Sequence, residues 1–399
     1  MEEVVIIDAV RTPIGRYDGA LKSIRPDDLG AIVLRAIRER NPIVSMHEVE
    51  EVVMGNANGA GEDNRNVARM STLLADFPKE VAATTINRLC GSGLDAVTYA
   101  ARAISLNQGD IMIAGGTESM TRAPYVMSKP DKGFKRGGAE LHDTTIGWRF
   151  THPSMEEKYG TDSMPETAQN VADLYDISRE NQDDFAFNSQ IKTKKAVDSG
   201  RLKDEIVPVT LQDRKTGTYT ITEDEHPRPT TTREKLRKLP SLFKEGSITA
   251  GNASGINDGA SALLLMSRKK AEELGVEPLA SYVTSAVAGV EPRFMGIGPV
   301  DATKKALKRA GMKVNDLDLI ELNEAFAAQS LACIRDLDLD SDIVNVNGGA
   351  IAYGHPLGAS GARILTTLVH EMRKRESKKG LATMCIGVGQ GISMIVKRY

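Results

Sequence analysis

The sequence predicts an α/β protein built around a largely parallel sheet, and three observations support this prediction. Short apolar runs alternate with helical stretches along most of the chain, as in proteins whose strands are joined by helical crossovers. The 36 glycines indicate many tight turns and close backbone contacts. The two ends of the chain also resemble each other, which favours two copies of one α/β unit.

The elements follow from the pattern of apolar residues. We expect strands at the apolar runs 4–7, 51–54, 111–114, 320–322, 343–346, 381–386 and 392–396. We expect helices at 27–38, 64–74, 94–106, 167–174, 179–199, 300–310, 325–336 and 360–375. The stretch from about 125 to 250 is richer in charge, Pro, Thr and Gly. Because helical periodicity returns inside that stretch, we predict an inserted cap there and not a disordered linker.

The likeness between the two ends concerns both the order of elements and the turns. "DDLGAIVLRAIRERNPIVSMHEVEEVVMGN" and "VDATKKALKRAGMKVNDLDLIELNEA" each give a helix, a polar turn and a strand that ends in Asn or Gly-Asn. "LCGSGLDAVTYAARAI" and "HPLGASGARILTTLV" each give a turn of small residues that leads into a helix. A spacing of this length is not that of a solenoid repeat. The likeness of the two ends instead favours an ancient duplication, with a reactive turn in each half.

Composition excludes several classes of protein. Lys and Arg number 51 against 54 Asp and Glu, a net charge of -3, so no strong field favours nucleic acid or an anionic membrane. We find no secretory signal and no run of about 20 uncharged apolar residues. The three cysteines do not make a disulfide framework, which is typical of a reducing cytoplasm. We therefore expect a cytoplasmic protein without nucleic-acid or membrane partners.

Cys90 is the first candidate for chemistry. It stands in "NRLCGSG", just before a predicted helix, where free backbone N–H groups and the helix dipole would lower a thiol pKa and favour the thiolate. The alternative is that Cys90 packs as a small apolar residue. This stretch alone leaves both interpretations open.

Two other glycine-rich turns carry His355 and Cys385. His355 lies in "NGGAIAYGHPLGASGAR", and a histidine is the usual general base near neutral pH; a loop histidine with one structural hydrogen bond is the alternative. Cys385 ends an apolar strand in "LATMCIGVGQGISMIV". That glycine run is not a dinucleotide fingerprint because no helix follows it. None of these residues has a close second ligand, so we predict no metal, and two thiols with a histidine favour covalent acyl chemistry.

Asn323 and Glu324 directly follow a predicted strand in "LIELNEAFAAQS". Polar side chains there can hold a water or a substrate oxygen, but Asn as a helix N-cap with Glu in the first turn is an equally good interpretation. Cys333 lies on an apolar helix face without a glycine turn. We predict that Cys333 is a core residue that alkylating reagents modify slowly.

Taken together, "NRLCGSG", "TAGNASGINDGA", "NEAFAAQ", "GGAIAYGHPLGASGAR" and "CIGVGQG" resemble the thiolase family, in the right order and over essentially the whole chain. "AGEDNRNVARM", "DTTIGWRF" and "YGTDSMPETAQNVADLY" are most similar to the β-ketoadipyl-CoA thiolases, with the 3-ketoacyl-CoA thiolases as near relatives. The resemblance implies two duplicated halves in a five-layer αβαβα sandwich. The N-terminal half would span 1–124 and be completed by 250–275, the inserted loop domain would span 125–249, and the C-terminal half would span 276–399.

The resemblance also implies roles for the singled-out residues. Cys90 would be the nucleophile that carries the acyl group, activated by His355, and Cys385 would act as acid and base. One oxyanion hole would consist of His355 and a water held by Asn323, and the other of the backbone N–H groups of Cys90 and Gly387. Each hole would place fixed donors where negative charge develops. Glu324 would support the site from its side.

The implied reaction is reversible thiolytic cleavage of a 3-oxoacyl-CoA, with CoA and acyl-CoA as substrates and no permanently bound cofactor. The positions that match the family's CoA path are Ser254, Ala250, Arg228, Phe243, Met164, Ala325 and Phe326. Ser163 stands where many biosynthetic thiolases have histidine, which weakens the case for a dedicated acetoacetyl-CoA synthase. A dicarboxylate substrate would need a cation near its acyl end, for which Arg122, Arg136 and Arg149 are candidates because they lie in or just before the insertion. For each of them, a solvent-exposed surface position is the alternative.

Several alternatives are kept beside this prediction. They are an acetoacetyl-CoA-forming acetyltransferase, a decarboxylating condensing enzyme, and a non-catalytic acyl-CoA or lipid-binding module of the same fold. The second thiol, Cys385, argues against a condensing enzyme, and the intact reactive residues argue against a binding module. The family also implies a homo-oligomer, either a dimer or a tetramer.

Overall fold

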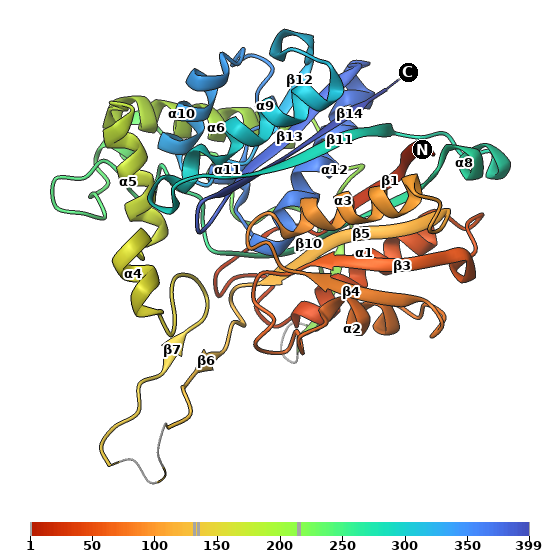
Figure 1. Ribbon diagram of the computed structural model, residues 1–399, viewed down its shortest axis with the longest axis horizontal. Helices are drawn as coiled ribbons and strands as arrows, with labels where there is room; N and C mark the ends of the chain where they lie inside the picture. The colour runs from red at the N-terminus through yellow and green to blue at the C-terminus, as the bar shows by residue number, and fades with distance from the viewer. Residues whose placement is uncertain (1, 131–132, 134–135, 214–216, 399) are drawn as a thin grey trace.

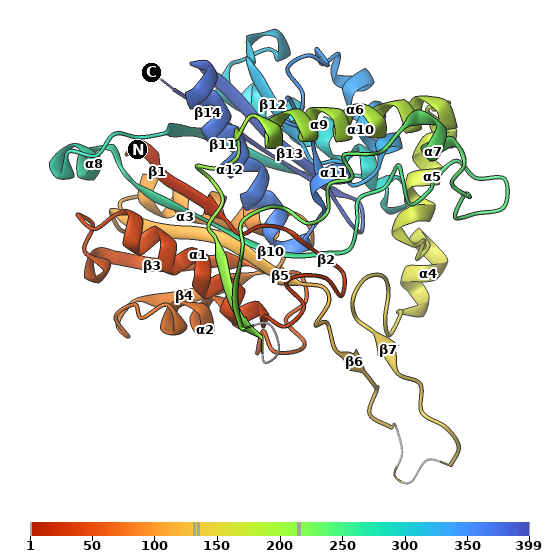
Figure 2. The ribbon, with the colours of Figure 1, turned by 180° about the vertical axis from the view of Figure 1, so that it is seen from behind.

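The computed structural model describes residues 2–130, 133, 136–213 and 217–398 (Figure 1). Its body is one mixed sheet in the order β12–β13–β14–β11–β1–β10–β5–β3–β4, with short β2 paired to β10. Helices cover and separate the two parts of this sheet (Figures 1 and 2). Within the described residues, no helix is long and apolar enough to cross a membrane.

The N-terminal half contains five long strands and their helices. Its elements are β1 (Val4–Arg11), β2 (Gly15–Arg16), α1 (Pro26–Arg40), η1 (Met46–Glu48), β3 (Val49–Gly55), α2 (Val67–Leu74), β4 (Ala82–Ile86), α3 (Ser92–Ser105), β5 (Ile111–Ser119), β10 (Asn257–Ser267) and α8 (Arg268–Leu274). β10 reaches this sheet only after the insertion, because the chain leaves the sheet at the end of β5 and returns at Asn257.

The C-terminal half repeats this plan. Its elements are β11 (Ala280–Gly289), η2 (Pro292–Ile297), α9 (Gly298–Ala310), η3 (Val314–Asp316), β12 (Leu319–Leu322), α10 (Ala327–Leu337), α11 (Ala350–Tyr353), α12 (Leu357–Arg375), β13 (Lys379–Ile386) and β14 (Gln390–Lys397). The pairing pattern is the same in each half: two antiparallel contacts (β1–β10–β5 and β11–β14–β13) and then parallel ones (β5–β3–β4 and β13–β12). This correspondence is the duplication that the sequence predicts.

The halves form five layers. α3 and α12 pack against each other in the middle, and their apolar residues share one core with strands of both halves. α1 and α2 pack on the outer face of the first half. α9 and α10 pack on the outer face of the second. The two halves of the sheet are joined by only two residue pairs, Val5–Ser281 and Ile6–Ala280, between β1 and β11.

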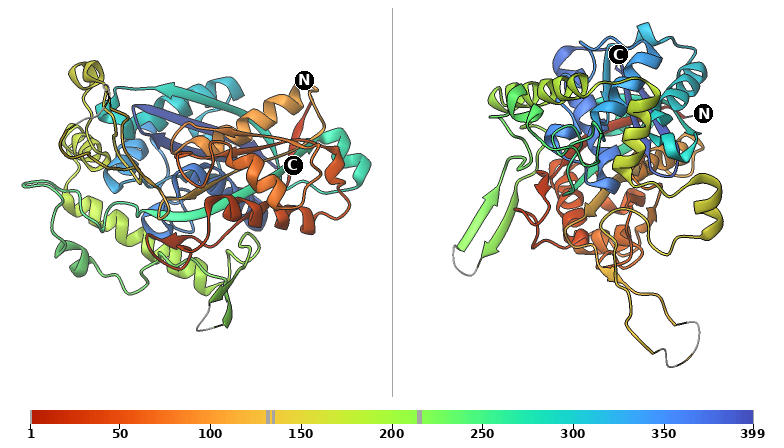
Figure 3. Two further views of the ribbon diagram at one scale, coloured as in Figure 1. Left: turned by 90° about the horizontal axis from the view of Figure 1, so that it is seen from below. Right: turned by 90° about the vertical axis from the view of Figure 1, so that its left-hand side faces the viewer.

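The insertion lies at one end of this sandwich. Its elements are β6 (Tyr125–Val126), β7 (His142–Asp143), α4 (Pro153–Tyr159), α5 (Met164–Leu174), α6 (Arg179–Asp198), β8 (Val209–Asp213), β9 (Gly217–Ile221) and α7 (Arg233–Arg237). α6 packs on α10 and α11, while the β6–β7 arm and the β8–β9 hairpin extend away from the body in different directions (Figure 3). The helices expected at 167–174 and 179–199 are present as α5 and α6.

Two expectations about the sheet are wrong. The sheet is not largely parallel, because β1, β10, β11 and β14 all pair antiparallel with their neighbours. The small residues of "ASYVTSAVAG" give β11 neither a clear alternation nor a long apolar run. β10 does contain the apolar run "ALLLM", which was an available signal for a strand, but its direction in the sheet is not readable from the run.

The run 343–346 is the second error, because it forms a single bridge from Val344 to Ile320 and no strand. Asn345 has a positive φ of 45°. Its side chain, and not its backbone, exchanges two hydrogen bonds with Leu322. The Asn345 side chain thus replaces the backbone hydrogen bonds that a fifth strand, beside β12, would make with Leu322.

Candidate active site

The turn that carries Cys90 joins β4 to α3. Leu89 has a positive φ of 46°, a costly conformation for a residue with a bulky side chain. The Ser92 hydroxyl donates to the Leu89 carbonyl at 2.6 Å and accepts from the backbone N–H of Arg88 at 2.8 Å. This local bonding holds Cys90 just before the start of α3, where the residue as a whole is half-buried.

A second strained turn, between β13 and β14, faces the first. Val388 has a φ of 62° although it is β-branched, and Gly389 has a φ of 75°. The backbone N–H of Gly387 points to Cys90, and a Cβ built on Gly387 would lie 3.5 Å from Leu89. Cys385 is buried near the end of β13 and close enough to Cys90 for Cys90 to contribute to its raised pKa. Backbone strain gathered on both sides of one thiol is typical of a functional site.

The turn that holds His355 comes before α12. Gly354 has a φ of 102°, and a Cβ there would lie 2.4 Å from the Asn257 side chain. Asn257, the first residue of β10, accepts a hydrogen bond from the backbone N–H of His355 at 2.9 Å. A Cβ on Gly93 would lie 2.8 Å from the Gly358 carbonyl. The His355 turn and the Cys90 turn are therefore in contact through the first turns of α12 and α3.

The hydrogen bonds of Ser360 fix the tautomer of His355. Ser360 Oγ lies 2.6 Å from His355 Nδ1 and also donates its single proton to the Pro356 carbonyl at 2.9 Å. Both bonds can exist only if Nδ1 carries the histidine proton. Nε2 is then an unprotonated acceptor, and it has no hydrogen-bond partner among the described residues.

Asn323 lies beside Cys385, between β12 and α10. Its backbone N–H donates to the Thr383 carbonyl at 3.0 Å, two residues before Cys385. Its side chain is buried, yet neither its amide oxygen nor its amide nitrogen has a partner in the described part of the chain. Because a buried unpaired amide is costly, this side chain and His355 Nε2 indicate a place where a polar ligand binds.

The helix-capping interpretation of Asn323 and Glu324 is wrong, because α10 begins at Ala327 with Phe326 as its N-cap. The buried Glu324 carboxylate instead accepts hydrogen bonds from Ser189, from Asn345 and from a backbone N–H. It thereby ties the insertion to the loop after β12, which fits the predicted supporting position.

The pKa of the Cys90 thiol is raised, whereas the sequence predicted that it would be lowered. Desolvation raises the pKa of the Cys90 thiol to about 11, although the backbone N–H groups of Gly387 and Cys90 act in the opposite direction. The predicted thiolate is therefore a neutral thiol in this structure. Burial, with help from Arg363, lowers the pKa of His355 to about 3, and burial raises the pKa of Cys385 well above its usual value. The thiol needs a base, and the neutral imidazole is one.

The predicted CoA positions fall into two adjoining groups. Arg228, Ala250 and Ser254 line a pocket of about 850 Å³. Met164, Phe243, Ala325 and Phe326 pack in one apolar cluster with Cys385. The groups meet where the Ser254 N–H donates to the Ala325 carbonyl at 2.9 Å. The pocket therefore adjoins the apolar cluster that contains Cys385.

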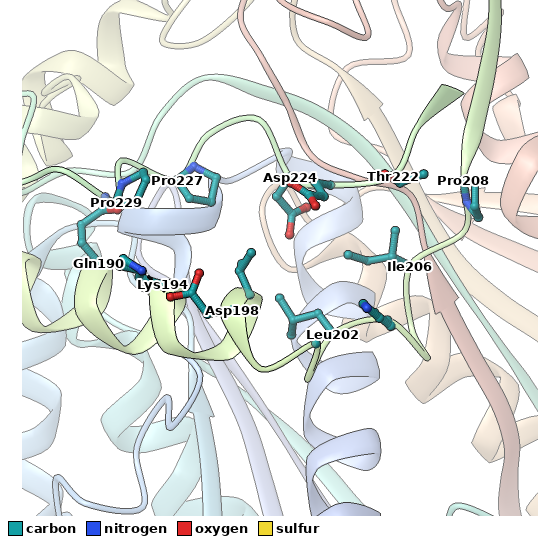
Figure 4. Close-up of a pocket in the computed structure, with 14 residues that line it drawn as sticks. Gln190, Lys194, Asp198, Leu202, Ile206, Pro208, Thr222, Asp224, Pro227 and Pro229 are labelled. Carbon is teal, nitrogen blue, oxygen red and sulfur yellow. Dashed lines mark hydrogen bonds and ion pairs between the residues drawn. The ribbon is translucent and has the colours of Figure 1, made fainter. Parts of the chain in front are cut away.

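A neighbouring cavity of about 440 Å³ lies between α6 and the segments 202–208 and 222–229 (Figure 4). None of the residues predicted for the site lines it. Among the described residues, no cluster of three or more His, Cys, Asp or Glu side chains is arranged to hold a metal ion.

The sequence reasoning missed two residues of this region, Glu118 and Ser360. Glu118 is buried and accepts hydrogen bonds from the backbone N–H groups of Ala57, Asn58 and Gly358. Its charge contributes to the raised pKa of Cys90. Its position at the end of a buried strand, in "GGTES", was the available signal. Ser360 resembles an ordinary helix residue, and only its contact with His355 distinguishes it.

Comparison with known proteins agrees with this geometry. The thiolase N-terminal domain profile matches residues 4–269, and the thiolase C-terminal domain profile matches 276–398. The chain is 58% identical to an Escherichia coli K12 3-oxoadipyl-CoA/3-oxo-5,6-dehydrosuberyl-CoA thiolase and 54% identical to a β-ketoadipyl-CoA thiolase of Acinetobacter baylyi, in each case over the whole of both chains. The crystal structure of human mitochondrial 3-ketoacyl-CoA thiolase is similar with a TM-score of 0.93 and 43% identity, covering 100% of this chain and 99% of that one. The chain belongs to the thiolase family of acyltransferases.

Proposed function

We propose that this thiolase cleaves 3-oxoadipyl-CoA with free CoA and yields acetyl-CoA and succinyl-CoA. The observation that carries this proposal is full-length identity of 54–58% to bacterial thiolases named for this substrate. The motif "DTTIGWRF" in the insertion supports the same substrate. Removing an acetyl unit from a six-carbon dicarboxylic acyl chain leaves the four-carbon succinyl group, so the products follow from the substrate.

In the first half-reaction, His355 Nε2 takes the proton of the Cys90 thiol, and the sulfur attacks the 3-oxo carbonyl. The tetrahedral oxyanion collapses, the bond between C2 and C3 breaks, and the electron pair passes into the enolate of acetyl-CoA. Cys385 donates a proton to C2, and acetyl-CoA leaves. The acyl group stays on Cys90 as a thioester.

In the second half-reaction, the Cys385 thiolate takes the proton of free CoA, whose sulfur attacks the thioester. Cys90 leaves as a thiolate and recovers its proton from His355, so every group returns to its starting state. The N–H groups of Cys90 and Gly387 donate to the oxyanion on the acyl carbon. Protonated His355 and a water held by Asn323 donate to the enolate oxygen of acetyl-CoA.

CoA would bind along the two groups of residues described above. Arg228 is joined at the 850 Å³ pocket by Arg16 and Lys235, and three cations suit the phosphates of CoA. The apolar cluster of Met164, Phe243 and the Ala325–Phe326 pair would contact the pantetheine arm. Because this cluster includes Cys385, the thioester at the end of the arm would lie next to the thiols.

A substrate panel tests the proposed function. We expect kcat/KM for 3-oxoadipyl-CoA to exceed that for acetoacetyl-CoA and for the uncharged 3-oxohexanoyl-CoA by about tenfold or more, since a hydrogen bond to a charged group such as the terminal carboxylate contributes about 1.5–3 kcal/mol. The CoA-dependent fall in 3-oxoacyl-CoA absorbance is the measurement. Equal or faster turnover of the uncharged chains would refute the dicarboxylate assignment, and preference for acetoacetyl-CoA would favour an acetyltransferase.

Ser360 offers a test of the proposed base. Ser360→Ala removes the acceptor that holds His355 in its reactive tautomer, so we expect kcat/KM to fall about 3- to 10-fold, with recovery in Ser360→Thr. Ser330→Ala is the matched control, because Ser330 is also buried and donates to the carbonyl four residues earlier but contacts no histidine. An equal loss in both variants, or no recovery with threonine, would mean that Ser360 only stabilises its helix.

The assembly and location are further parts of the proposal. We expect a homodimer or homotetramer, measured by light scattering after size-exclusion chromatography. Three free cysteines suit a reducing compartment such as the cytoplasm.

A further inference from the structure

The terminal carboxylate of a dicarboxylic acyl chain needs a cation near the thiols, and the structure separates the three candidate arginines. Arg122 is neutralised, because its guanidinium makes two hydrogen bonds of 2.5 and 2.7 Å to the Glu62 carboxylate. Arg136 is exposed and lies between β6 and β7, and these two strands belong to an arm that extends away from the body (Figure 1). Arg122 therefore lacks a free charge, and Arg136 lacks a position from which to bind a substrate at Cys90.

Arg149 is different, because it is half-buried and faces a neutral partner. Its Nη2 lies 3.5 Å from Asn58 Oδ1, and among the described residues no carboxylate lies within ion-pair distance of it. The Asn58 amide nitrogen donates to the backbone and hydroxyl oxygens of Thr144. These bonds turn the Asn58 oxygen toward the guanidinium. The amide orients Arg149 without cancelling its charge.

Through Asn58, Arg149 is connected to the His355 turn by a series of hydrogen bonds. The backbone N–H of Asn58 donates to Glu118 at 3.2 Å, and the same carboxylate accepts from Gly358 at 2.7 Å. Gly358 follows His355 by three residues. Glu118 also lies near enough to Cys90 to raise the pKa of its thiol.

Through its neighbour Trp148, Arg149 is also connected to the segment that contacts the Gly387 turn. The Trp148 indole donates to the Asp162 carbonyl at 3.3 Å, which fixes the 148–149 segment beside the start of α5. Met164, two residues after Asp162, has its sulfur 3.6 Å from a Cβ built on Gly387. Arg149 therefore lies between two segments that both border Cys90.

We propose that Arg149 binds the terminal carboxylate of the substrate's acyl group and so sets the preference for a dicarboxylic chain. This inference rests on the proposed function. A guanidinium suits the role because its planar donors bind a carboxylate through two parallel hydrogen bonds. The CoA end of the substrate is directed elsewhere, toward Arg228 and Ser254, so the two charged ends have separate binding places.

The test compares Arg149→Gln with the matched control Arg136→Gln, which removes an exposed arginine from the same insertion. Each is assayed with 3-oxoadipyl-CoA and with 3-oxohexanoyl-CoA, which has the same chain length without the carboxylate. We expect Arg149→Gln to lower kcat/KM for 3-oxoadipyl-CoA about 10- to 100-fold, and to change that for 3-oxohexanoyl-CoA less than about twofold. Arg149→Lys should recover part of the loss, since lysine keeps the charge but not the planar donors.

The uncharged substrate is an internal control for folding. If the unaltered enzyme shows no preference for 3-oxoadipyl-CoA, the proposed function fails, whatever Arg149 does. If the preference exists and Arg149→Gln keeps it, or lowers both activities equally, the assignment of Arg149 fails while the proposed function stands. Loss of the preference in Arg136→Gln also overturns the assignment.

Discussion

Replacing Cys90 with alanine is expected to lower kcat/KM by about 10⁴-fold or more, because no other group can form the acyl thioester. Cys385 stands close by but is held as a neutral thiol by burial, so it does not replace the nucleophile. The measurement is the CoA-dependent fall in 3-oxoacyl-CoA absorbance. Mass spectrometry of the enzyme mixed with 3-oxoacyl-CoA in the absence of free CoA should find the acyl group on Cys90 in the parent chain and on no residue of the variant.

Cys333→Ala is the matched control for this prediction. Cys333 is fully buried in α10, and its sulfur lies 3.3 Å from the Gly296 carbonyl, so the variant should keep nearly all activity. Iodoacetamide should label Cys90 faster than Cys333, because Cys90 is only half-buried and has His355 as a base while Cys333 is fully buried, and substrate should protect Cys90. Activity that survives in Cys90→Ala, or an acyl group found on another residue, would refute the proposed mechanism.

Replacing His355 with alanine is expected to lower kcat/KM about 10²- to 10⁴-fold, the range for loss of a general base. The pH dependence gives a sharper test. A base whose pKa is lowered to about 3 stays unprotonated as the pH falls through 6.5, and a thiol whose pKa is raised to about 11 stays protonated on the alkaline side. The neutral thiol–imidazole pair therefore persists between these values, so neither Cys90 nor His355 should give kcat/KM an inflection between them wherever the fold is stable.

The control for this profile is a circular dichroism measurement over the same pH range, which shows where the protein stays folded. A fall in kcat/KM with an apparent pKa near 6.5, while the fold is intact, would show that His355 titrates as an ordinary histidine. A fall in the His355→Ala variant with the same pKa would assign that titration to another group.

The sequence predicted the residues that meet at the site better than it predicted the sheet that positions them. Cys90, His355 and Cys385 stand in glycine turns, and such turns are readable because glycine marks places where backbone approaches closely. β11 could not be predicted because its small residues follow neither the helical nor the strand period, and the apolar run "ALLLM" of β10 does not show which strands lie beside it. Their neighbours come from distant parts of the chain, so the antiparallel order is a tertiary property.

The ionisation of Cys90 could not be predicted either. A position before a helix lowers the pKa of an exposed thiol, but desolvation outweighs that effect here. Desolvation depends on what the β13–β14 turn and the His355 turn cover, and both lie more than two hundred residues away in the chain. The difference between Arg122 and Arg149 could not be predicted for the same reason. Glu62 neutralises Arg122 and Asn58 leaves the charge of Arg149 unpaired, and neither partner lies in the insertion.

The contact of α3 with α12 has a consequence for the origin of the reaction. Cys90 and His355 each stand two residues before the first residue of equivalent helices in the two halves, so one ancestral position supplies a nucleophile in one copy and a proton acceptor in the other. Their separation is set by how closely the helices pack, and a Cβ on Gly361 would lie only 2.3 Å from the Leu94 nitrogen. An ancestral dimer of identical halves would have carried two nucleophiles or two acceptors. Fusion into one chain allowed the two to diverge.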